Sequence, residues 1–218
     1  MQEIFYKISY EVNKAFAEID FDLTDPTVPK YLDFEQKGLL PATSKLPRYK
    51  MVLGGTPMDL INSSAISSCL VISTSIVDYF ENLSLPLHQY FDVSFIHRKK
   101  LYDNYKALYI AKDPKFLDMI DWEQSEFYKT QDYHKIVLEK YTFRDWDEMV
   151  NFDKSFWGTE FGFLRKLKIK YSEPYDIIRF GYFGFPPGYI CTEKVRNEIE
   201  NKGFTGFAFE PVEEGVFI

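Results

Sequence analysis

The sequence has no long hydrophobic run. None of its 218 residues belongs to an apolar segment near the length of about 20 residues that a membrane-spanning helix needs. The opening residues, MQEIFYKISYEV, alternate and carry charges inside the apolar stretch, unlike a secretory signal peptide. We therefore expect a cytoplasmic protein with no membrane partner.

Residues that bind metals or form disulfides are also scarce. The two cysteines, Cys69 and Cys191, are too few for a disulfide framework, and each lies in an apolar stretch, so we expect buried free thiols. The three histidines, His88, His97 and His134, have spacings that fit no zinc motif. The sequence predicts no metal site and no cofactor.

Catalytic motifs are equally absent. There is no G-x-S-x-G sequence, and neither cysteine has a neighbour that would lower its pKa. The glycines of LGGTP (53–57) lack the spacing and the lysine of a phosphate-binding loop, so a turn is the simpler interpretation. The sequence alone assigns no catalytic and no cofactor-binding residue.

The chain is instead rich in acidic residues and in aromatic residues. The net charge is −7, which argues against a nucleic-acid partner. Residues 113–153 hold eleven Asp and Glu against five Lys and Arg, so most of this charge is local. Phe, Tyr and Trp make up 18% of the residues, enough to fill much of a core and to supply anchors at an interface.

The clearest local pattern lies near the end of the chain. Residues 189–191 are a short apolar strand, and Thr192 is a good N-cap for the helix that follows. Gly203 is a natural left-handed stop for that helix. Residues 204–210 then alternate as a half-buried strand before Pro211. The pattern predicts a strand-helix-strand unit.

A second copy of this unit is predicted upstream. Residues 69–95 align with 188–214 without a gap at an offset of 119, so that Ser73 falls on Thr192. The alignment predicts a strand at 70–73 and a helix at 76–83. Chance similarity between two common units is the alternative, because few residues are identical.

These elements predict an α+β fold: a mixed, largely antiparallel sheet with a few helices, containing two similar strand-helix-strand units. No Gly/Ser linker divides the chain, so we expect one α+β domain over 1–218, with lobes of about 1–110 and 111–218 as a possible subdivision.

One short acidic stretch can be interpreted in three ways. Asp145, Trp146, Asp147 and Glu148 can form the solvated face of a helix. The carboxylates of Asp145, Asp147 and Glu148 can instead act with His134 as the acid and base of a small-molecule enzyme. The four residues can also be a partner-binding surface, in which Trp146 is the anchor and the carboxylates attract a basic protein.

The tail resembles the C-terminus of bacterial immunity proteins from polymorphic toxin systems, whose closing signature runs roughly S-x-x-L-x-x-A-I-x-x-x-G-L-T-G-(V/I/L)-x-F-x-P-V. The positions that match it here are Thr192, Val195, Ile199, Gly203, Thr205, Gly206, Phe209, Pro211 and Val212. The stretches LVISTSIVDYFENL and IDWEQSEF are similar to the middle section of the same proteins.

The resemblance implies a cytoplasmic protein that binds a cognate toxin domain and blocks it without catalysis. It supplies no catalytic residue. The immunity function is therefore our leading expectation. A small-molecule enzyme is the alternative, and an adaptor module without a toxin is a third.

Overall fold

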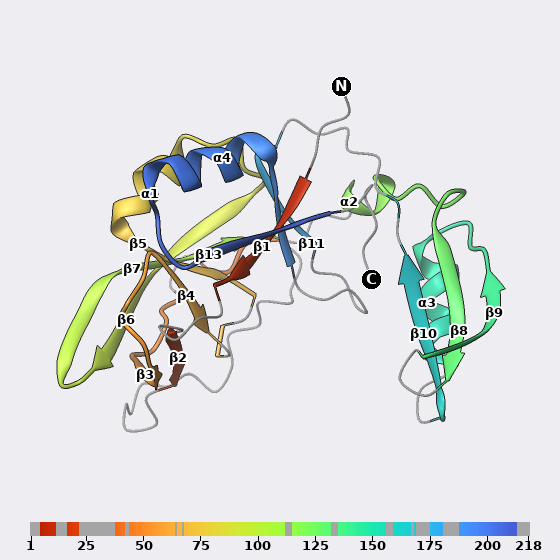
Figure 1. Cartoon of the computed structure of the whole chain (residues 1–218), viewed down its shortest axis with the longest axis horizontal. Helices are drawn as coiled ribbons and strands as arrows, with labels where there is room; N and C mark the ends of the chain where they lie inside the picture. The colour runs from red at the N-terminus through yellow and green to blue at the C-terminus, as the bar shows by residue number, and fades with distance from the viewer. Residues whose placement is uncertain are drawn as a thin grey trace. The chain divides into compact units, whose positions relative to one another are not determined.

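The computed structural model divides the chain into two compact units (Figure 1). Unit 1 comprises Met1–Asp113 and Pro174–Glu210, and unit 2 comprises Pro114–Glu173 and Pro211–Ile218. The structure describes residues 5–11, 17–21, 38–41, 44–63, 65–66, 68–111, 115–131, 135–155, 159–166, 168, 175–180 and 188–212. The lobes suggested by the sequence would place residues 174–210 in the second half, whereas the structure packs them within unit 1.

The described residues of unit 1 form two sheets. The first has the strand order β11-β12-β1-β13, with β1 and β11 both antiparallel to β12. The bounds of its strands are Phe5–Tyr10 (β1), Ile177–Phe180 (β11), Gly188–Thr192 (β12) and Phe207–Pro211 (β13). Residues from the two ends of the described chain thus lie in one sheet.

The second sheet of unit 1 closes on itself in the order β2-β3-β6-β7-β5-β4. Most of its pairs are antiparallel, while β2 with β4 and β3 with β6 are parallel. The bounds are Ala17–Phe21 (β2), Tyr49–Gly54 (β3), Leu60–Ser63 (β4), Leu70–Ser73 (β5), His88–His97 (β6) and Lys100–Ile110 (β7). This mixed, largely antiparallel pattern with a few helices confirms the predicted α+β class.

The two predicted strand-helix-strand units are confirmed, and they share a topology. One is β5–α1–β6 with α1 at Thr74–Glu81, and the other is β12–α4–β13 with α4 at Glu193–Lys202. In each unit a strand from elsewhere in the chain lies between the two strands: β7 in the first and β1 in the second. Both units are therefore split βαβ arrangements.

Helix α4 forms for the reasons that the sequence suggested. The Thr192 hydroxyl accepts a hydrogen bond from the Val195 backbone N–H at 3.4 Å, and Gly203 ends the helix with φ of 70°. Val195 and Ile199 are buried on the inner face. Helix α1 also begins after its predicted N-cap, but Ser73 makes no capping bond and donates instead to Asp59.

Unit 1 buries two apolar clusters. One includes Ile19, Tyr49, Val71, Phe95 and Tyr109 from the closed sheet. The other is built by both helices and both sheets, and its members include Ile72, Ile76, Phe80, Leu108, Ile177, Tyr189, Val195 and Ile199. Packing between the two strand-helix-strand units thus forms a continuous core. Cys69 and Cys191 are free thiols and are buried, as predicted.

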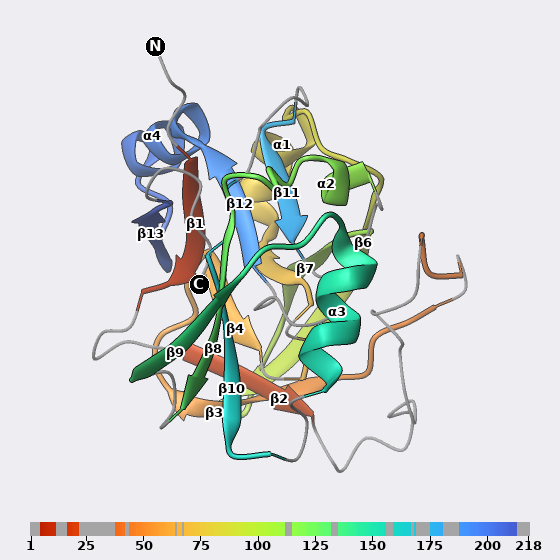
Figure 2. The same ribbon diagram turned by 90° about the vertical axis from the view of Figure 1, so that its right-hand side faces the viewer.

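Unit 2 is the smaller of the two units and is built on an antiparallel sheet (Figure 2). Its sheet has the order β10-β8-β9, all antiparallel, with β8 at Glu126–Gln131, β9 at Ile136–Tyr141 and β10 at Phe161–Lys166. Helix α2 covers Lys115–Asp118, and α3 covers Trp146–Lys154. Phe152 of α3 packs on Tyr141 and Phe143, with ring centroids 4.3 and 5.2 Å away.

Some elements differ from expectation. The sequence TPMDLINSSAISSC (56–69) is compatible with a helix that opens at Pro57 or with a loop, but it contains the strand β4, in which Leu60 and Ile61 are both buried within the closed sheet. The short helix α2 was not predicted. In the part of the chain that the structure describes, no helix is long and apolar enough to cross a membrane.

Candidate functional site

The predicted acidic stretch lies at the start of helix α3. Asp145 is the N-cap, and its Oδ1 accepts a hydrogen bond from the backbone N–H of Glu148 at 2.9 Å. Asp147 and Glu148 occupy the first turn, where a negative charge interacts favourably with the helix dipole. The cap at Asp145 therefore fixes the start of α3 and with it the position of Trp146, the first residue of the helix.

Glu148 turns back toward the residue before the cap. Its Oε2 accepts the backbone N–H of Arg144 at 2.8 Å, and the Arg144 guanidinium lies 3.3 Å away. The backbone hydrogen bond, followed by the guanidinium contact, lowers the pKa of the Glu148 carboxyl. The Glu148 carboxylate thus makes its contacts at the start of the helix, with Arg144.

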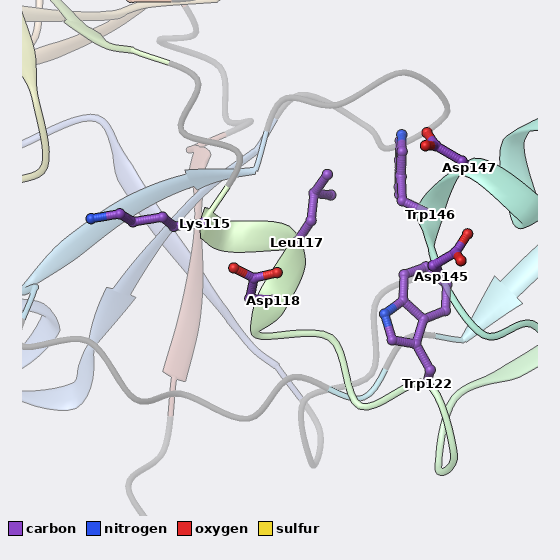
Figure 3. A pocket seen from close by; sticks show the side chains of 7 residues that line it. All are labelled: Lys115, Leu117, Asp118, Trp122, Asp145, Trp146 and Asp147. Atoms are coloured by element: carbon purple, nitrogen blue, oxygen red, sulfur yellow. The ribbon is translucent and has the colours of Figure 1, made fainter.

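A pocket of about 380 Å³ opens beside this helix start (Figure 3). All the residues that line it belong to unit 2: Lys115, Leu117, Asp118, Trp122, Asp145, Trp146 and Asp147. They come from α2, from the turn that follows it and from the first turn of α3. Two indoles and three carboxylates therefore share one concave surface.

The turn that carries Trp122 is fixed by hydrogen bonds within unit 2. Asp121 is buried, and its backbone N–H donates to the carbonyl oxygen of Lys168 at 2.8 Å. The Ser125 hydroxyl donates to the carbonyl oxygen of Asp121 at 2.6 Å. Trp122 itself stacks on Phe127 with a centroid distance of 5.9 Å. The indole on this side of the pocket is thus positioned by contacts within unit 2.

The charge of the pocket is negative and partly unpaired. Asp118 and Asp147 are exposed, and neither side-chain carboxylate makes a hydrogen bond or ion pair with a residue in the described ranges. Among the described residues of the lining, Lys115 is the single basic one, and in Figure 3 its side chain points away from the two indoles. Such a surface attracts a cation that can also lie against an aromatic ring.

Three of the four predicted partner-binding residues line this pocket, namely Asp145, Trp146 and Asp147, while Glu148 does not. Asp118 and Trp122 also line the pocket and were not predicted, although both lie within the acidic region 113–153. Trp122 lies in the stretch IDWEQSEF, which is similar to the middle section of the immunity proteins, whereas Asp118 lies outside that stretch. Their proximity to α3 depends on tertiary folding.

The enzyme alternative depends on a histidine. His134, the base of the enzyme alternative, lies outside the described residues. Among the residues that the structure describes, no group of three or more His, Cys, Asp or Glu side chains is placed to hold a metal ion.

Comparison with known proteins adds no assignment: no protein-family model matches the sequence, and no curated protein matches it.

Proposed function

We propose that this protein is an immunity protein, which binds a cognate toxin domain in a one-to-one complex and blocks it without catalysis of its own. Two independent features support the proposal. One is the resemblance of the tail to immunity proteins of polymorphic toxin systems. The other, which carries the proposal, is the pocket of unit 2 that brings Trp122 and Trp146 together with unpaired carboxylates.

The chemistry of this pocket favours a basic side chain of a protein partner. A lysine or arginine that enters it meets an indole face, which attracts cations by about 0.5–2 kcal/mol. The same cation can pair with Asp118 or Asp147, which have no partner of their own among the described residues. Tryptophan anchors surrounded by charge are typical of the residues that dominate binding energy at protein interfaces.

The acidic pocket also gives the net charge of −7 a role in the association with the proposed partner. A concentrated acidic surface steers a basic protein toward it and speeds association. A toxin domain that cleaves nucleic acid needs a basic surface of its own, so it would be a suitable partner. No observation on the described residues specifically favours the enzyme alternative.

The decisive test is direct binding. The toxin is sought as the variable C-terminal domain of a large secreted protein encoded directly upstream of this gene. That domain, purified in an inactive form, should bind with one-to-one stoichiometry in calorimetry, and the active form should lose its activity when this protein is added. A neighbouring domain that neither binds this protein nor is inhibited by it would overturn the proposal.

A further inference from the structure

The pocket of unit 2 presents one face of an indole ring. Trp122 is half-buried, and the ring of the fully buried Phe127 lies almost parallel to it, with an interplanar angle of 12°. Phe127 therefore covers one face of the indole, and the opposite face is the one left for the pocket that Trp122 lines. An indole face attracts a cation more strongly than the ring of tyrosine or phenylalanine does.

The carboxylates of the pocket have unused acceptor atoms. Asp145 accepts the hydrogen bond of the helix cap through Oδ1, and the carboxylates of Asp118 and Asp147 make no hydrogen bond or ion pair within the described ranges. In Figure 3, Leu117 and Asp118 of α2 lie across the pocket from Trp146. A flat aromatic surface, an apolar side chain and groups that only accept hydrogen bonds therefore line one cavity.

We infer that the side chain of the partner that enters this pocket is an arginine and not a lysine. A guanidinium is planar, so it can stack on Trp122 while its N–H groups point outward in the ring plane. Two of these groups can donate in parallel to one carboxylate, that of Asp118 or Asp147. The methylene stem of the arginine can pack against Leu117.

A lysine would fit the same surface less well. Its ammonium is compact and strongly hydrated, so contact with an indole removes more favourable hydration than it does for a guanidinium. Its three N–H groups do not lie in one plane, so an ammonium placed over the ring turns some of them away from the carboxylates. Lysines of the partner should therefore act mainly through long-range attraction.

The arginine belongs to the toxin domain of the proposed function, on which this inference rests. A cavity of about 380 Å³ has room for a side chain but not for a helix or a strand. The toxin domain should therefore present the arginine from a projecting, exposed segment of its surface.

Small probes test the preference without the toxin. N-acetyl-arginine-N-methylamide and N-acetyl-lysine-N-methylamide carry the same charge, and the citrulline analogue is a neutral probe of nearly the same shape as the arginine one. In NMR titrations that follow the tryptophan indole N–H signals, the dissociation constant should be about fivefold or more lower for the arginine probe than for the lysine probe. The citrulline probe should bind more weakly than either. Equal binding of the arginine and lysine probes, or no shift of an indole signal with the arginine probe up to about 100 mM, would overturn the inference.

Matched charge variants locate the bound probe. The double variant Asp118→Asn with Asp147→Asn should raise the dissociation constant of the arginine probe by about fivefold or more. The double variant Asp92→Asn with Asp103→Asn removes the same charge from exposed positions of unit 1, and it should change the constant by less than about twofold. Equal effects of the two double variants would show that the probe senses only the net charge, and would overturn the inference.

The stacking contact has its own test. Trp122→Leu should remove most of the preference for the arginine probe, because a leucine offers no ring to the guanidinium. Circular dichroism checks that this variant folds, since Trp122 also contacts Phe127. A folded Trp122→Leu protein that keeps the full preference would overturn the inference.

The outcome of these titrations is separate from that of the toxin-binding test. If the arginine probe is preferred but the neighbouring toxin domain does not bind, the immunity proposal fails and the preference of the pocket stands. If the toxin domain binds tightly while the probes show no preference, the arginine inference fails and the immunity proposal stands.

Discussion

Asp59 binds Thr205 through both its backbone and its side chain. The Thr205 backbone N–H and hydroxyl donate to Asp59 Oδ2 at 2.9 and 3.0 Å, and the Asp59 backbone N–H donates to the Thr205 hydroxyl at 3.1 Å. The other carboxylate oxygen accepts hydrogen bonds from Ser73 at 2.6 Å and Ser75 at 2.8 Å, at the start of α1. One carboxylate therefore joins the two strand-helix-strand units of unit 1.

The first prediction concerns this junction. Asp59→Asn should lower the free energy of unfolding by about 1–3 kcal/mol, because an amide cannot accept four hydrogen bonds and its NH₂ group would face donors. Asp92→Asn is the matched control: Asp92 pairs with Lys106 at the surface, its side chain is 90% exposed, and its removal should cost less than about 1 kcal/mol. Urea titration of both variants measures the difference. Equal effects would show that the Asp59 junction is not important for stability.

The stability of the protein should also depend on pH through the Asp59 carboxylate. Burial raises the pKa of Asp59, but the hydrogen bonds from Ser73, Thr205 and Ser75 outweigh it, so the pKa in the folded protein lies below its ordinary value of 3.8. A carboxyl whose pKa is lowered by folding contributes its full stabilisation when the pH is above its pKa in the unfolded chain. This contribution is lost as the pH falls through its pKa in the folded protein. The difference in unfolding free energy between the parent and Asp59→Asn should be constant above about pH 5 and shrink below about pH 4. A difference that stays constant down to about pH 2.5 would contradict it.

Substitution by alanine should destabilise the protein to different extents at two glycines near the end of the chain. Gly203 and Gly206 both have positive φ, of 70° and 89°, but only Gly206 is tightly enclosed. A Cβ at position 203 would meet nothing within 4 Å, whereas one at position 206 would lie 2.3 Å from the carbonyl oxygen of Leu60. We expect Gly203→Ala to cost about 1 kcal/mol from backbone strain alone. Gly206→Ala should cost about 3 kcal/mol, since backbone must also move.

Thermal and urea unfolding of these two alanine variants give the comparison directly. The order matters more than the absolute values, because both changes add the same methyl group at a left-handed position. If Gly203→Ala were the more damaging, the close approach of Gly206 to Leu60 would not be a significant constraint.

These contacts explain which parts of the fold could be predicted from sequence. The caps of α4 are local, since Thr192 and Gly203 act on a helix within three residues of themselves, and both were predicted correctly. Thr205 and Gly206 matched the signature of the immunity families, but their roles were not visible. Their contacts are with Asp59 and Leu60, which lie almost 150 residues earlier in the chain.

The candidate site divides in the same way. Asp145, Trp146 and Asp147 are neighbours in sequence at the start of a predicted helix, so they could be selected together. Trp122 and Asp118 reach the same pocket from α2 and its following turn. No periodicity or local motif connects the two stretches, because packing brings them together. Glu148 was included for its charge, although the contacts of that charge with Arg144 direct it away from the pocket.

The indole of Trp146 should be an anchor for the proposed toxin partner. Trp146→Ala should weaken binding by about 2 kcal/mol, as measured by calorimetry. Trp122→Ala should weaken it as well, a result that the pocket predicts and the sequence did not. Each variant must retain the thermal transition of the parent, because Trp122 also stacks on Phe127. Two stable variants that bind as tightly as the parent would move the interface away from this pocket.

Charge reversal at the pocket should act mainly on the rate of association. Asp147→Lys places a cation where the proposed basic partner arrives, so association measured by stopped flow should slow by about tenfold at low salt. Asp92→Lys makes the same change in net charge at an exposed position of unit 1, and it should have a much smaller effect. Added salt should reduce the difference between the two variants, since exposed charges are screened over about 8–10 Å at physiological ionic strength. If both reversals slow association equally, the partner senses only the overall charge of the protein, and the carboxylates of the pocket have no special role in its capture.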